Sequence, residues 1–246
     1  MRVVSYNILK GGVGRADPIA EVLLAQKPDV VGLVEATDPE ILDRIAWRLG
    51  FDYVHAPSPN GKWGSALLSR LPIESSTNVA ALRFDGPRSF LWATLQGEID
   101  VGVLHLTSKP REKKEKKRIE QLRAMLDVTA DARQAGRRHV LMGDFNATMP
   151  DWPLDRSIVP KRHRDAVKKQ GDVPRAAMAT MLAAGYEDSH AGTKSPTLTT
   201  LRPWLKVDHI LSRGLTCGEA WIETDRLAQY ASDHFPVGAS FEVDAK

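Results

Sequence analysis

The chain has 246 residues, of which 42% are hydrophobic and 26% charged, and its formal net charge is +3 at pH 7. This composition is typical of a soluble globular protein. No apolar run approaches the roughly 20 residues that cross a bilayer, and the N-terminus lacks the apolar core of a signal peptide. We therefore predict no membrane span and a cytoplasmic location. The single cysteine, Cys217, excludes an intrachain disulfide and a cysteine-based zinc site.

Strands and helices are predicted to alternate in the first fifty residues. The apolar runs Val3–Tyr6 and Asp29–Val34 predict two buried strands. A helix is expected from Asp17 to Gln26, with Asp17 as its N-cap. A second helix is expected after Asp38, with Pro39 at its first position and a stop at Gly50.

The middle of the chain is predicted to be rich in strands. Three short β-rich runs, separated by turn-forming residues, are Ser65–Ser69, Ser89–Leu95 and Ile99–Leu106. A long helix is then expected from Glu112 to Gln134, because apolar residues recur along one face. These features indicate locally paired strands followed by one long amphipathic helix.

The second half returns to mixed strands and helices. Strands are predicted at His139–Met142, Val207–Leu211 and Phe235–Val243, and a short helix at Pro174–Ala184. The segment 150–175 has little apolar periodicity and is predicted to be a loop insertion. Two mixed β-sheets packed face to face, with helices outside, would satisfy this order of elements. We predict one α/β domain over residues 1–246.

Carboxylates at strand ends predict a metal site. Glu35 follows an apolar strand, where a carboxylate is costly to bury without a partner. It is therefore the predicted principal ligand of a hard cation, and Asp233 is a further candidate ligand. Magnesium suits such a site, because it is commonly held by one or two carboxylates and substrate phosphate. Manganese is the expected substitute.

Acid, amide and imidazole side chains predict catalysis of attack on a phosphate ester. Asp144 and Asn146 lie two residues apart after a strand, so both can face the same side. One can take a proton from water while the other donates to a phosphoryl oxygen. His234 could donate to the phosphate, with Asp208 holding its imidazole in the charged form. His105 is a second candidate donor.

Seven short segments occur in an order and spacing that resemble one known family. They are Ser5–Asn7, Glu35, Gly64–Arg70 with Pro72, His105–Leu106, Gly143–Asn146, Val207–Ile210 and Ser232–Val237. With them the chain resembles the endonuclease/exonuclease/phosphatase superfamily of magnesium-dependent phosphoesterases. The resemblance implies a four-layer αββα sandwich with the site at one edge. It also implies Asn7 and Glu35 around the metal, Asp144 as the base, and His234 paired with Asp208.

Three departures from the pattern bear on the subtype. Relatives that cut at abasic sites usually carry an aspartate where Leu9 stands, and an aromatic-rich segment where residues 200–206 stand. Histidine at position 105, instead of their usual tyrosine, is similar to the deoxyribonuclease and sphingomyelinase branches. The resemblance therefore argues against abasic-site repair.

Basic residues and one tryptophan are candidates for substrate binding. Cations at a helix N-terminus oppose the helix dipole, so the run before and into the long helix is not explained by helix stability. A solvated helix face is the alternative interpretation. Trp204 stands in a proline-marked loop and could line a cleft. The predicted substrate-binding residues are Lys109, Lys113, Lys114, Arg118 and Trp204.

The leading hypothesis is a metal-dependent phosphodiesterase, specifically a nuclease acting on DNA or RNA. The enzymatic alternative is a phosphomonoesterase, or a phospholipid headgroup hydrolase of the sphingomyelinase or phosphoinositide type. A non-catalytic binding module is the third possibility. The predicted partner is a phosphate-ester substrate such as a nucleic acid, and no obligate protein partner is indicated.

Overall fold

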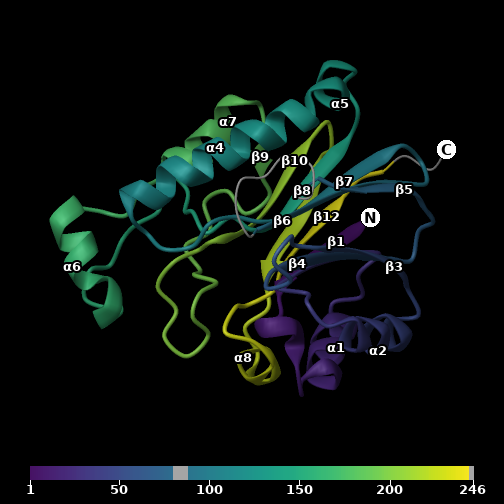
Figure 1. Cartoon of the computed structure of the whole chain (residues 1–246), viewed down its shortest axis with the longest axis horizontal. Helices are drawn as coiled ribbons and strands as arrows, with labels where there is room; N and C mark the ends of the chain where they lie inside the picture. The colour runs from purple at the N-terminus through teal and green to yellow at the C-terminus, as the bar shows by residue number, and fades with distance from the viewer. Residues whose placement is uncertain (80–87, 244–246) are drawn as a thin grey trace.

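Two mixed six-stranded sheets pack face to face in the computed structural model, which describes residues 1–79 and 88–243 (Figure 1). The first sheet has the order β11 (Cys217–Ile222), β12 (Val237–Phe241), β1 (Arg2–Asn7), β2 (Val30–Val34), β4 (Gly64–Ser69) and β3 (Asp52–Pro57). The second has the order β5 (Ile73–Asn78), β6 (Ser89–Leu95), β7 (Ile99–His105), β8 (His139–Asp144), β10 (Asp208–Arg213) and β9 (Glu187–Asp188).

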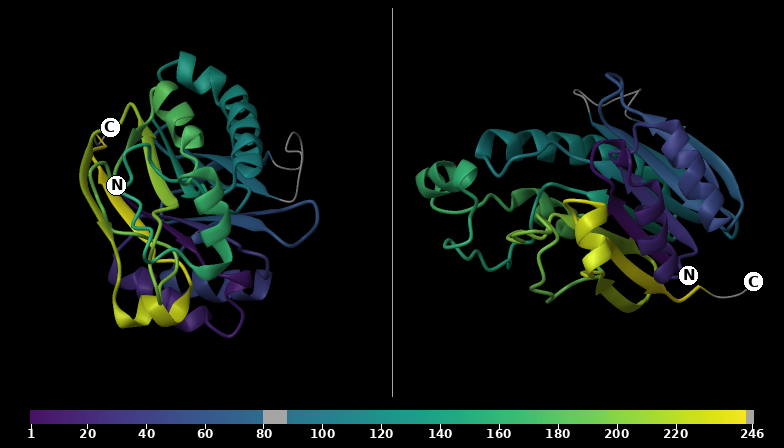
Figure 2. Two further views of the ribbon diagram at one scale, coloured as in Figure 1. Left: turned by 90° about the vertical axis from the view of Figure 1, so that its left-hand side faces the viewer. Right: turned by 90° about the horizontal axis from the view of Figure 1, so that it is seen from below.

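Helices cover the outer face of each sheet (Figures 1 and 2). The first sheet is covered by α1 (Ala16–Ala25), α2 (Pro39–Leu49) and α8 (Arg226–Ala231). The second is covered by α4 (Glu112–Val128) and α7 (Ala176–Ala183), while α5 (Ala130–Gln134) follows α4 and α6 (Lys161–Gln170) lies at one end of the molecule. The predicted four-layer αββα sandwich is confirmed. None of the helices in the described ranges is long and apolar enough to cross a membrane.

The strands form three cores because successive side chains point to opposite faces. On β1, Val3 belongs to the core between the sheets and Val4 to the core beneath α1, α2 and α8. On β8, Met142 faces the other sheet and Leu141 packs beneath α4 and α7. The central strands of both sheets are therefore buried on both faces, which explains why they read as nearly continuous apolar runs.

The helix ends test the predicted capping residues. Asp38 caps α2 by accepting from Glu40 N at 3.0 Å, and Gly50 ends it at φ 68°, both as predicted. The predicted N-cap of α1 is wrong by two residues, because Arg15 is the N-cap and Asp17 lies in the first turn. The carboxylate of Asp17 instead accepts from Arg44 Nε at 2.9 Å. The long helix predicted over 112–134 is divided at Thr129.

The segment 150–175 is not simply a loop, because it contains α6. Its apolar side chains are buried together with Trp204 in a small separate core, whose members from this segment are Trp152, Val159, Val167 and Val173. Only Val167 of α6 itself is buried. Because α6 buries only one residue, its sequence has no apolar stripe that would have predicted a helix. The predicted loop was therefore wrong at α6.

A buried ion pair lies beneath the second sheet and predicts a large effect on stability. Lys206 is 1% exposed, and its Nζ lies 3.0 Å from Asp188 Oδ2 and 2.8 Å from His209 Nδ1. Asp188→Ala leaves this ammonium buried without its counter-ion, so we expect the free energy of unfolding to fall by about 3–5 kcal/mol. Urea denaturation measures this change.

The matched control is Asp17→Ala, which removes an aspartate whose side chain is 42% exposed and pairs with Arg44 and Arg48. Solvent screens such exposed ion pairs, so this variant should unfold near the wild-type midpoint. Equal destabilisation by Asp188→Ala and Asp17→Ala would contradict the role given to burial.

Candidate active site

The register of the second sheet aligns three of the predicted residues. His105 at the end of β7 lies opposite Asp144 on β8, and Asp144 lies opposite Asp208 on β10. Adjacent strands are about 4.8 Å apart, so these side chains lie side by side where the three strands begin or end. The carboxylate Oδ2 of Asp144 is 3.4 Å from His105 Nε2.

Gly143 allows this alignment. Its φ is 143°, and a Cβ built on it would lie 1.9 Å from the carbonyl oxygen of Leu104. Any side chain at this position would push β7 away from β8. The glycine that precedes Asp144 therefore keeps Asp144 and His105 adjacent.

The first sheet contributes Asn7 and Glu35 from the ends of neighbouring strands. Asn7 Nδ2 donates to Glu35 Oε1 at 3.4 Å and to Asp144 Oδ2 at 3.3 Å, so one amide links both sheets. The backbone N–H of Lys10 donates to Glu35 Oε2 at 2.8 Å. Glu35 has φ 59°, a left-handed conformation that is costly for a residue with a Cβ and clusters at functional sites. The predicted proximity of Glu35 to Asp144 is therefore found.

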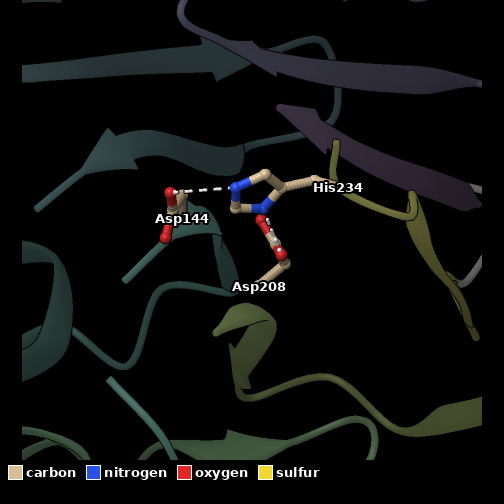
Figure 3. Close-up of side chains that lie close together, drawn as sticks. All are labelled: Asp144, Asp208 and His234. Atoms are coloured by element: carbon tan, nitrogen blue, oxygen red, sulfur yellow. Dashed lines mark hydrogen bonds and ion pairs between the residues drawn. The ribbon is translucent and has the colours of Figure 1, made fainter. Parts of the chain in front are cut away.

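His234 lies between two carboxylates (Figure 3). Its Nδ1 donates to Asp208 Oδ2 at 2.8 Å, and its Nε2 lies 3.9 Å from Asp144 Oδ2. All three side chains are buried. His234 precedes β12 of the first sheet, whereas both aspartates belong to the second sheet, so this contact also joins the sheets.

Burial and neighbouring charges raise the pKa values of both Asp144 and His234. Burial raises the pKa of Asp144 to about 7, against the opposing charge of His234. Burial alone would lower the pKa of His234, but the charge of Asp208 and the hydrogen bond to it raise that pKa to about 10. Near neutral pH the site therefore holds an imidazolium beside a carboxyl group that is poised to exchange a proton.

The donor set fits a metal ion. One potential ligand atom from each of Asp144, Asp208 and His234 lies within 4.8 Å of the others. Asp208 Oδ1 is buried and has no hydrogen-bond partner within residues 1–79 and 88–243, and such an orphaned oxygen requires a cation or water. Glu35 and Asp233 are both half-buried, and both lie outside this group. The charge of Asp233 contributes to the raised pKa of His234.

Arg88 is a site residue that the sequence analysis missed. It is 6% exposed, donates from Nη1 to His105 Nε2 at 2.9 Å, and lies 4.0 Å from the centre of the Trp63 ring. Its Nη2 donates to Ser108 Oγ at 3.0 Å. The available signal was a charged residue directly beside an apolar strand. The same kind of signal identified Glu35.

The contact with Arg88 corrects the predicted role of His105. Because arginine only donates, His105 Nε2 accepts and is not the donor to phosphate that we predicted. Burial and the charges of Arg88 and His234 also hold the pKa of His105 well below its ordinary value. His105 therefore orients Arg88, whose positive charge faces Asp144 and Glu35.

Residues 4–234 match the endonuclease/exonuclease/phosphatase family. The chain belongs to this family. It is accordingly a hydrolase that acts on phosphate esters. No curated protein matches the sequence.

Solved structures share the fold at low sequence identity. An AP endonuclease from Archaeoglobus fulgidus has a TM-score of 0.73 and 22% identity, with 99% of this chain and 100% of that chain covered. A 3' phosphatase from Neisseria, bound to product DNA hairpin, has a TM-score of 0.75 and 21% identity at the same coverage. A mannosyl-6-phosphatase from Bacteroides thetaiotaomicron has a TM-score of 0.70 and 19% identity, again with 99% and 100% covered.

A cavity of about 260 Å³ adjoins this family site, and two predicted substrate-binding residues line it. Lys109 and Trp204 form part of its wall, together with Asn146. Asn146 Nδ2 donates to the Leu106 carbonyl at 3.1 Å, which leaves its second N–H for a phosphoryl oxygen. Lys113 is exposed and Lys114 half-buried on the first turn of α4, and neither lines the cavity.

Arg118 has a structural role, so its predicted contact with substrate is wrong. It is 1% exposed and forms an ion pair with Glu115 at 2.6 Å. Its Nη1 donates to the carbonyl oxygens of Thr107 at 2.8 Å and Lys109 at 3.0 Å. The guanidinium therefore fixes the segment that follows β7 and presents Lys109 to the cavity.

The two shifted pKa values predict the pH dependence of kcat/KM. Activity should rise with pH through about 7 as Asp144 ionises, and fall near about 10 as His234 loses its proton. Asp208→Asn removes the charge that contributes most to raising the pKa of His234, so the alkaline limb should move to lower pH. Initial rates measured from pH 5 to pH 11 would follow both limbs.

Asp233→Asn is the matched control, because Asp233 is a weaker contributor to the same pKa. It should move the alkaline limb less than Asp208→Asn does. An alkaline limb unmoved in Asp208→Asn would mean that His234 is not the group that titrates there.

Proposed function

We propose that this hydrolase is a divalent-metal-dependent phosphodiesterase that cleaves DNA or RNA. The observation that carries the proposal is the buried Asp144 carboxylate between Asn7 and His234, with Glu35 linked through the same Asn7 amide. A base, a cationic donor and a metal-binding carboxylate at one edge are the groups that phosphodiester hydrolysis needs. The basic cavity beside Asn146 supports a polyanionic substrate.

Each side chain of the site has a separate role in hydrolysis. Asp144 accepts the proton of the attacking water, and the His234 imidazolium donates to a phosphoryl oxygen. Asp208 holds that imidazole in place, because its Oδ2 accepts from Nδ1. Arg88 adds a fixed positive charge beside Asp144. In this arrangement Asp144 activates the water, and the phosphate faces two cations, His234 and Arg88. Such an arrangement suits in-line attack on phosphorus.

Glu35 is the residue that we assign to the metal, and magnesium is the ion that we propose. When bound there, magnesium would neutralise negative charge on the phosphoryl and leaving oxygens. Asn7 was predicted as an oxygen ligand, but its Oδ1 accepts from Leu9 N at 3.0 Å while its nitrogen faces the carboxylates. We therefore assign Asn7 the task of holding Glu35 beside Asp144.

Phosphomonoester hydrolysis is the second candidate. Asp144 and His234 act at phosphorus and require no second ester group. Two of the similar structures are named as phosphatases, one acting on a 3' phosphate and one on a mannosyl 6-phosphate. A phosphatase would use the same residues, so only the substrate distinguishes the two functions.

The test is a hydrolysis panel of single-stranded DNA, duplex DNA, RNA, a phosphoinositide, sphingomyelin and mannose 6-phosphate. We expect cleavage of a polynucleotide in magnesium, loss of that cleavage in EDTA, and recovery on adding magnesium or manganese. Release of inorganic phosphate from a monoester without chain cleavage would favour the second candidate. Polynucleotide cleavage that persists in EDTA would reject the metal-dependent mechanism.

A further inference from the structure

The 150–175 segment builds one wall of the cavity beside the active site. Arg162 and His163, from the first turn of α6, line this cavity opposite Asn146. The His163 ring stacks on Trp204 at 5.4 Å between centres and 18° between planes. Arg162 Nε donates to His163 Nε2 at 3.1 Å, which fixes this cation beside the stacked pair.

A second, larger cavity continues from the first. Its volume is about 750 Å³, and Arg162 lines both cavities. Three further cations line it, namely Lys161, Arg164 and Arg202, and no acidic side chain of the described chain lines either cavity. The two cavities therefore share a wall formed by Arg162 of α6, the helix at one end of the molecule (Figure 1).

The positive charges that line the two cavities face no acidic side chain in either lining. Burial lowers the pKa of His163 to about 4, and the charges of Arg162, Arg111 and Lys109 add to this effect. Three cations thus surround a ring that is neutral near pH 7. Gathered charges of one sign repel one another, so the arrangement suits an anionic ligand that also presents a flat apolar surface.

A nucleotide has both features, a phosphate and a planar base. Bases stack on aromatic side chains with little sequence preference, while cations follow the backbone phosphates. A base can enter a cavity only when it leaves the duplex stack, which costs a few kcal/mol in a paired strand and little in an unpaired one. The cavity therefore favours an unpaired nucleotide.

We propose that the 150–175 segment binds an unpaired strand next to the scissile phosphate. The neighbouring base contacts the His163 ring, which stacks on the buried Trp204, and the phosphates beyond it lie along Arg162, Arg164 and Arg202. This inference rests on the proposed nuclease function and narrows it to single-stranded polynucleotides or unpaired strand ends. A segment that follows Asp144 and Asn146 in the sequence thus selects the substrate.

Three substrates separate strand binding from chemistry. They are a labelled single-stranded oligonucleotide, the blunt duplex of the same sequence, and bis(p-nitrophenyl) phosphate, a diester without neighbouring nucleotides. We expect His163→Ala to lower kcat/KM on the single strand about 5- to 100-fold, the range that loss of one stacked base gives. We expect Arg162→Ala to lower it similarly and to reduce its salt dependence by about 0.7 in the log–log slope. Rates on the small diester should stay within about twofold.

The control variant is Lys168→Ala, which removes a cation from α6 that lines neither cavity. It should leave all three rates unchanged. Thermal unfolding of each variant checks that the separate core beneath the segment persists. Equal loss on the small diester, no loss on the single strand, or cleavage of the blunt duplex as fast as the single strand would overturn the inference.

Binding distinguishes this inference from the proposed function. Fluorescence anisotropy measures the affinity of Asp144→Asn protein for the labelled single strand without cleavage. Weaker binding after adding Arg162→Ala or His163→Ala supports the strand-binding segment even if the wild type cleaves no polynucleotide. Unchanged binding in both double variants would reject it even if cleavage occurs.

Discussion

Asp144→Asn is expected to lower kcat for phosphodiester hydrolysis by about 10²- to 10⁴-fold, the contribution of a positioned general base. An amide has nearly the shape of the carboxyl group but accepts no proton from water at neutral pH. Its neighbour Asn146 can stay in place, because Asn146 N donates to Asp144 Oδ1 at 2.8 Å and an amide oxygen can accept the same bond. The new Nδ2 replaces the oxygen that accepts from Asn7 Nδ2, so that bond is lost, while Asn7 keeps its bond to Glu35. Steady-state rates in magnesium measure the loss.

The same substitution should not destabilise the fold. The folded pKa of Asp144, about 7, lies above its ordinary value of 3.8, so the folded protein binds this proton more tightly than the unfolded chain does. This stabilisation is present at low pH and is lost as the pH rises through about 7. At pH 8 the wild type holds a buried charge that Asp144→Asn lacks, and the variant should melt at an equal or higher temperature.

Asp151→Asn is the matched control, an exposed acid beyond the same strand. It should keep wild-type kcat. Full activity in Asp144→Asn would remove the base from the mechanism, and a large drop in its Tm would mean that the charge stabilises the fold.

Strand ends made most of the site predictable from sequence. Glu35, Asp144 and Asp208 each follow or begin an apolar run. Burying a carboxylate there costs free energy unless it has a hydrogen-bond, ionic or metal partner. The register of β7, β8 and β10 brings Asp144 beside Asp208 and His105, whereas Glu35 comes from the first sheet. The link between the sheets through Asn7 came only from the ordered resemblance, because no local pattern pairs residue 7 with residue 144.

The failures concern burial and orientation, which local sequence does not encode. Arg118 belongs to a run of cations, yet it is the member that points inward, toward Glu115 and the segment after β7. His105 occupies the predicted place, but Arg88 converts its Nε2 from donor to acceptor. Both outcomes depend on how the segments pack in three dimensions, so residue type and spacing alone could not assign these roles.

His234→Ala is expected to impair both catalysis and folding. Loss of a donor that faces the phosphate should lower kcat by about 10²- to 10³-fold. The variant also leaves Asp208 and Asp144 buried without the imidazolium between them, so the free energy of unfolding at pH 7 should fall by about 3–5 kcal/mol. Urea denaturation and steady-state rates measure the two effects.

The sign of the pH dependence follows from the folded pKa of His234, about 10, which lies above its ordinary 6.5. Its stabilisation is fully present below pH 6.5 and disappears as the pH rises through about 10. The destabilisation by His234→Ala should therefore be larger at pH 6 than at pH 10.5. Equal destabilisation at both values would point to lost packing instead of lost charge.

Combining the substitutions tests whether one imidazolium balances both carboxylates. Asp144→Asn removes one of the two negative charges that His234→Ala would leave unpaired, so the double variant should lose less stability than the sum of the single changes. Residues that share a charge network show coupling energies of about 0.5–3 kcal/mol. Additive changes would mean that Asp144 and His234 act independently, in which case the 3.9 Å between their side chains is proximity without electrostatic consequence.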